Sequence, residues 1–112
     1  MIIRGKDLPV EQRTGERLGT STKILTEEQM HNKTKVFAHI ALKPGSKTPL
    51  HKHEGTFEGF YILAGTGLVN DNGKMVQVSA GDVVFTDDGE THGIENNGNT
   101  DLEYIALVTY CG

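Results

Sequence analysis

Three histidines and one glutamate are spaced so that they could share one metal ion. His51 and His53 are two residues apart, so both rings point to the same side if this segment is extended. Glu58 lies five residues beyond His53, and a bend at Gly55 could bring its carboxylate back toward the pair. His92 begins a later segment. Three imidazoles and a carboxylate suit Mn, Fe, Co, Ni or Zn, and they disfavour copper(I), which prefers sulfur.

Four protein ligands leave room on such an ion. A six-coordinate metal held by four protein groups keeps two positions for water, a substrate or dioxygen, whereas a purely structural site is closed. We therefore expect one divalent transition metal bound by His51, His53, Glu58 and His92. The expected partner of this site is a small molecule.

The rest of the chain predicts the strands that must position these residues. The 112 residues include 14 glycines and show hardly any helical periodicity, which indicates short strands joined by tight turns. Asp71-Asn72-Gly73 is a strong hairpin signal, because Asn-Gly readily adopts positive φ. Residues 1–20 are expected to form an edge strand or a partly mobile arm, and Thr26-Glu27-Glu28-Gln29 has capping-box spacing. The eight expected strands are Thr22–Leu25, Val36–Leu42, Phe57–Ala64, Leu68–Asn70, Lys74–Val78, Asp82–Phe85, Thr91–Glu95 and Leu102–Tyr110. Their spacing is typical of an all-β sandwich or barrel.

The composition argues against several classes of protein. Apolar residues make up 36% and charged residues 23%, which is ordinary for a globular chain and unlike a disordered one. The formal net charge of −4 argues against a nucleic-acid partner, and no apolar run approaches the ~20 residues of a membrane span. The N-terminus lacks the features of a secretory signal, and the single cysteine, Cys111, has no internal partner. A cytoplasmic location is therefore expected.

The spacing of the candidate ligands resembles the two motifs of the cupin superfamily. Residues 45–65 place the first three ligands between two glycines and are similar to the first motif, and residues 81–96, which contain His92, are similar to the second. Asp87 stands where the second motif usually has proline, which predicts a looser loop before His92. The resemblance implies one domain over residues 1–112, folded as an RmlC-like cupin double-stranded β-helix, or jelly roll. It also implies that the same four residues bind the metal.

The resemblance implies a metalloenzyme that acts on a small polar or anionic metabolite, of decarboxylase, dioxygenase, isomerase or lyase type. The alternative is a metal-dependent binding or sensing module without turnover. No residue stands out as a general acid or base; Asp87, Glu90 and Tyr61 are the candidates. An N-terminal arm folded over the barrel mouth could also bring one of Arg4, Arg13 and Arg17 to an anion.

Several other side chains have predicted places in the barrel. Phe60 and Ile62 share the parity of Glu58 and are expected to line the pocket beside the metal. Tyr61 has the other parity and should face a second sheet or subunit, whereas His39 is either a surface residue or points to the interior. The last expected strand is apolar on both faces, so we expect a homodimer that buries the surplus apolar surface.

Overall fold

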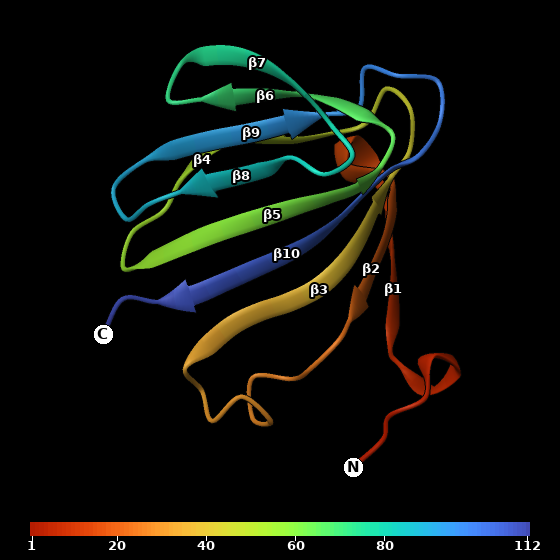
Figure 1. Cartoon of the computed structure of the whole chain (residues 1–112), viewed down its shortest axis with the longest axis vertical. Helices are drawn as coiled ribbons and strands as arrows, with labels where there is room; N and C mark the ends of the chain where they lie inside the picture. The colour runs from red at the N-terminus through yellow and green to blue at the C-terminus, as the bar shows by residue number, and fades with distance from the viewer.

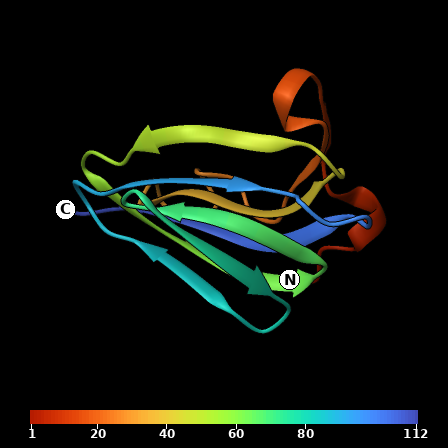
Figure 2. The ribbon, with the colours of Figure 1, turned by 90° about the horizontal axis from the view of Figure 1, so that it is seen from above.

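A computed structural model describes residues 1–112 as two antiparallel sheets that face each other (Figures 1 and 2). The larger sheet has the order β1-β2-β3-β10-β5-β8, and the smaller one has the order β4-β9-β6-β7. The strands are β1 (Val10–Arg13), β2 (Gly19–Lys23), β3 (Thr34–Leu42), β4 (Lys47–Lys52), β5 (Thr56–Ala64), β6 (Thr66–Asp71), β7 (Lys74–Ser79), β8 (Val83–Thr86), β9 (Thr91–Glu95) and β10 (Leu102–Tyr110). The helical elements are two 3-10 turns, η1 (Gly5–Asp7) and η2 (Gly15–Arg17), and neither could cross a membrane.

The core lies between the two sheets and is built from one face of each strand. On β3, Ala38 and Ile40 are buried, whereas His39 between them is half-buried on the outer face and pairs with Glu103 at 3.0 Å. This alternation follows from the pleat, which sends successive side chains to opposite faces. Of the two predicted places for His39, the one in the barrel interior is therefore wrong. The core residues are Ala38, Ile40, Leu42, Phe60, Ile62, Val69, Val78, Val84, Ile94, Leu102, Tyr104 and Ala106.

Two strands of the structure lack the apolar pattern of the others, and only one of them, β4, was not predicted as a strand. β4 is almost entirely exposed and β1 is exposed along most of its length, so neither carries the apolar alternation that marks a strand. β1 is the edge strand that residues 1–20 were expected to supply, and it pairs with β2. The predicted hairpin joins β6 to β7, with Asn72 and Gly73 at φ of 52° and 92°.

Two chain connections at one end of the fold position the candidate site (Figure 1). The β4–β5 connection carries His53, and the β8–β9 connection carries Gly89 and Glu90. Their backbones bond to each other: His53 N–H donates to the Glu90 carbonyl at 3.0 Å, and Gly89 N–H donates to the His53 carbonyl at 2.7 Å. The two sheets are thereby fastened together beside the predicted ligands.

Candidate metal centre

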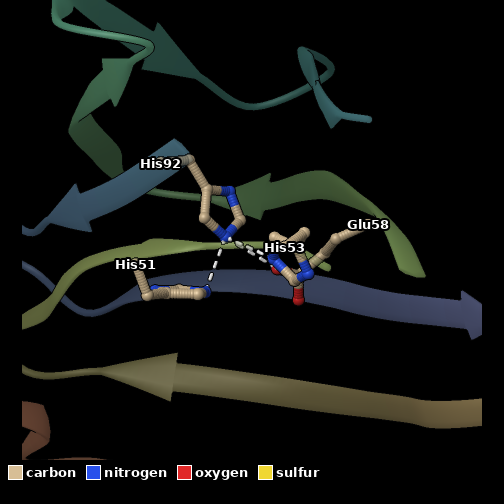
Figure 3. A group of neighbouring side chains, drawn as sticks. All are labelled: His51, His53, Glu58 and His92. Carbon is tan, nitrogen blue, oxygen red and sulfur yellow. Dashed lines mark hydrogen bonds and ion pairs between the residues drawn. The ribbon is translucent and has the colours of Figure 1, made fainter. Parts of the chain in front are cut away.

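The structure brings the four predicted ligands together between the sheets (Figure 3). His51 lies on β4, His53 follows it, Glu58 lies on β5 and His92 lies on β9. His51 and His92 are directly opposite each other in the β4–β9 register. The predicted bend is present at Gly55, whose φ is 78°, and it returns the chain so that Glu58 faces the histidines. His53, Glu58 and His92 are buried, and His51 stands at the open side.

The donor atoms are close enough to share one ion. All four lie within 4.8 Å of one another. His92 Nε2 is 2.9 Å from His51 Nε2, 3.0 Å from His53 Nε2 and 2.8 Å from Glu58 Oε1. Two donors bound at about 2.1 Å lie roughly 3.0 Å apart when they subtend a right angle and roughly 3.4 Å apart at a tetrahedral angle. The three distances from His92 therefore fit the edges of an octahedral site, in which two positions would stay open.

The outer nitrogen of each imidazole is already engaged away from the cluster. The Pro49 carbonyl can only accept, so His51 Nδ1 carries the proton and its Nε2 keeps a lone pair toward the centre. Such partners fix the tautomer and orientation of metal-binding histidines. The three pairs are His51 with the Pro49 carbonyl at 2.9 Å, His53 with Thr56 Oγ1 at 2.9 Å and His92 with Thr86 Oγ1 at 2.8 Å.

No lysine or arginine pairs with the carboxylate of the cluster. The Glu58 carboxylate is buried, and its ion-pair partners are only His53 and His92. Burial lowers the pKa of His53 below its ordinary value, and the neighbouring His92 and His51 lower it further, although Glu58 opposes the shift. A buried carboxylate that has only imidazoles beside it carries a charge that a bound cation would neutralise. The chemistry of the donor set therefore fits a divalent metal.

An open cavity of about 390 Å³ adjoins the cluster. Its walls include His51 and Glu58 on the metal side and two guanidinium groups from the N-terminal residues. A second cavity, of about 450 Å³, shares Arg17, His51 and Glu58 with the first and extends past Lys35 and Lys52. The first cavity is lined by Arg13, Arg17, Val36, Ile40, Thr48, Pro49, His51, Glu58, Phe60, Tyr104 and Ala106.

The three candidate acids and bases lie outside these cavities. Asp87 and Glu90 bond within their own loop, where Glu90 Oε1 accepts from the Asp87 N–H at 2.9 Å. Tyr61 is half exposed on the outer face of β5, as its parity predicts. Of the two residues expected to line the pocket, Phe60 does so, whereas Ile62 is fully buried in the core. The prediction for Ile62 is wrong because Ile62 is the next inward-facing residue after Phe60 on β5 and lies farther from the open end of the barrel.

Three residues of the site were missed by sequence reasoning. Thr56 shares the parity of Glu58 on β5, so strand alternation could have found it. Thr86 lies opposite Glu58 in the β5–β8 register, which the sequence does not reveal. Tyr104 was seen only as part of an apolar strand, and no local pattern marks its hydroxyl. Long-range register is the missing information in both of the last two cases.

The fold and the ligand geometry define a cupin. The family model described as "Cupin domain" matches residues 38–108, so the chain belongs to the cupin family. The structure has the jelly-roll architecture of that family. A solved RmlC-like cupin from Shewanella frigidimarina, 18% identical, superposes with a TM-score of 0.78 over 97% of this chain and 89% of that one. This likeness concerns the fold alone.

Much closer relatives come from Thermotoga maritima. The chain is 49% identical to a protein named "Oxalate-binding protein", over 96% of this chain and 93% of that protein. It also resembles a crystal structure described as a predicted oxalate decarboxylase from the same organism. The identity is 48% and the TM-score is 0.89, over 98% of this chain and 99% of that one.

Proposed function

We propose that this chain is a metal-dependent cupin that binds a small dicarboxylate of the oxalate class. His51, His53, Glu58 and His92 would hold one divalent transition metal, of the Mn, Fe, Co, Ni or Zn group. When bound, the ion supplies Lewis acidity toward carboxylate oxygens. The observation that carries the proposal is the convergence of four metal-binding atoms at the edge of a cavity that also holds two guanidinium groups.

The surroundings of the cavity favour an anion. Arg13, Arg17, Lys35 and Lys52 line the two joined cavities, against the carboxylates of Glu54 and Glu58, although the whole chain carries a formal charge of −4. A basic mouth on an acidic protein concentrates anions locally and raises their association rate. The name of the 49% identical relative, an oxalate-binding protein, supports the same class of ligand.

Turnover is the second candidate, because the 48% identical solved structure is described as a predicted oxalate decarboxylase. The wall residues that could transfer a proton, apart from the metal-binding set, are Tyr104 and the exposed Lys35, Lys52 and Glu54 of the outer cavity. Burial raises the pKa of Tyr104 far above neutrality, which disfavours it as a general base. Binding is therefore better supported by this cavity than proton-transfer chemistry.

Calorimetry on metal-free and Mn²⁺-loaded protein tests the proposal. Oxalate should bind to the loaded protein and not to the metal-free one, because the ion supplies the chelating positions. Formate and carbon dioxide should be measured on the same samples under air, since their formation would establish the decarboxylase instead. If oxalate binds equally well with and without metal, the proposed function is wrong.

We also propose a homodimer formed through the outer face of the larger sheet. Tyr61, Leu63, Val83, Phe85 and Leu107 are 38% to 68% exposed there. In the strand register, Tyr61 lies beside Val83. Phe85 and Leu107 both pair with Gly59 of β5, one from each side. This contiguous apolar area lies on the edge strand β8 and its neighbours, where a second copy would cover it.

A further inference from the structure

We infer that the N-terminal arm, defined as residues 10–17, completes the ligand site. In this arrangement Arg13, Arg17 and the hydroxyl of Tyr104 bind the part of the dicarboxylate that the metal does not bind. This inference rests on the proposed function and deepens it. It assigns ligand-binding roles to three residues that lie outside both cupin motifs.

The arm is held in place by the sheet. Arg13 is the last residue of β1 and lies opposite Gly19 in the β1–β2 register. A Cβ on Gly19 would lie 1.9 Å from the Ala41 carbonyl oxygen, so β2 packs as closely on β3 as the backbone permits. η2, which ends at Arg17, lies beside β4, the strand that carries His51 (Figure 2). The backbone that carries the two arginines is therefore held beside the cavity, with the Arg13 side chain half-buried and that of Arg17 exposed.

The guanidinium groups lack an adequate partner within the chain. Arg13 is only 20% exposed, and its nearest counter-charge is the Glu11 carboxylate, 3.8 Å away and 73% exposed. Neither Arg13 nor Arg17 donates a side-chain hydrogen bond to the protein. A guanidinium presents several N–H donors in a planar fork that matches a carboxylate. These donors are available to a ligand in the cavity.

Tyr104 supplies a neutral donor beside them. The residue is 1% exposed and lines the cavity, and its hydroxyl has no partner in the protein; since no enclosed polar atom lacks a partner, this hydroxyl reaches the cavity itself. The ring packs on Phe60 at 4.5 Å between centroids, and Phe60 in turn stacks on His92 at 5.2 Å. In the open cavity this hydroxyl is free to donate to a ligand in place of water.

The charges favour an anion that carries more than one negative charge. Counted at the first cavity alone, with neutral histidines, a divalent ion and two guanidiniums exceed the carboxylates of Glu58 and Glu11 by two positive charges. A small dicarboxylate cancels this excess, whereas a monocarboxylate such as acetate cancels half of it and reaches only one end of the site. Val36, Ile40 and Ala106 complete an apolar wall that offers nothing to a hydroxyl-rich sugar. The ligand class is therefore a compact dicarboxylate.

Variants of the three residues test the inference on Mn²⁺-loaded protein. Arg13→Gln and Arg17→Gln should each weaken oxalate binding by ~10- to 100-fold, the range for a lost charge-assisted hydrogen bond, and Tyr104→Phe by ~3- to 10-fold. Acetate binding should change much less. Arg4→Gln is the matched control, because Arg4 lies in the same N-terminal segment but does not line the cavity.

Metal content and melting temperature separate a lost ligand contact from a damaged site. Every variant should retain one Mn²⁺ per chain and a cooperative transition, since none of the three residues belongs to the metal-binding set. If the wild type binds oxalate and all three variants bind it equally well, this inference is wrong and the proposed function stands. If the metal-loaded wild type fails to bind oxalate, both fail.

Discussion

Replacing Thr86 by valine tests how much the hydrogen bond between Thr86 and His92 contributes to the candidate metal centre. Thr86 is completely buried, and its hydroxyl lies 2.8 Å from His92 Nδ1, which is also buried. Valine keeps the branched shape and removes only the hydrogen-bonding group. The His92 ring then loses the partner that orients it, while all four candidate metal-binding side chains remain.

Two magnitudes follow from this single lost contact. Removal of an outer partner of a metal-binding histidine typically weakens the metal by ~10- to 100-fold, or about 1.4 to 2.7 kcal/mol. In the metal-free protein, a buried nitrogen left without a partner costs about 1 to 3 kcal/mol of folding free energy. Thr86→Val should therefore bind Mn²⁺ and Zn²⁺ more weakly and unfold at lower denaturant.

Competition with a chromophoric chelator measures the affinity, and urea unfolding measures the stability. Thr22→Val is the matched control, because Thr22 lies on β2, is half-buried and makes no side-chain hydrogen bond. The control should stay within twofold of the wild type. Equal metal affinity in Thr86→Val and Thr22→Val would refute the reasoning that the hydroxyl orients His92.

Four further predictions concern the metal, the dimer and the fold. His51→Ala should lose most of its metal by elemental analysis yet keep the wild-type circular dichroism spectrum, because His51 lies outside the core. Mn²⁺ at 100-fold over Kd should stabilise the unmutated protein by about 2.7 kcal/mol, measured as a rise in melting temperature. No rise would contradict the site. Phe85→Lys should halve the mass found by light scattering, and a wild type that is already monomeric would exclude the proposed dimer. Asn96→Ala should cost about 3 kcal/mol in urea, since the buried amide donates to the Leu42 and Thr100 carbonyls at 2.8 Å and accepts a third bond; a cost below about 1 kcal/mol would contradict this.

The sequence predicted those strands whose apolar residues alternate. β3, β5 and β10 have one buried face, and the Asn72–Gly73 turn fixes the β6–β7 hairpin by its local preference. β4 could not be found in the same way, because Lys47–Lys52 has no buried face and is a strand only through its pairing with β9. Pairing of this kind is a long-range property that local pattern does not encode.

In the candidate site too, local sequence predicts some residues and long-range packing determines the others. The spacing of His51 and His53 and the bend before Glu58 are local, so residue types and parity suffice to group them. The approach of Arg17 and Tyr104 depends on how η2 and β10 pack against β4 and β5, which only the assembled sheets determine. The sequence therefore allowed an N-terminal arm near the barrel mouth, and the structure shows that Arg13 and Arg17 of this arm line the cavity.

The central claim is that three imidazoles and one carboxylate share a single ion. Anomalous diffraction from crystals grown with Mn²⁺ tests it most directly, because the signal locates the ion without reference to the protein atoms. We predict one peak within about 2.3 Å of Nε2 of His51, His53 and His92 and of a Glu58 oxygen. A peak elsewhere, or none at these four atoms at saturating Mn²⁺, would contradict the claim.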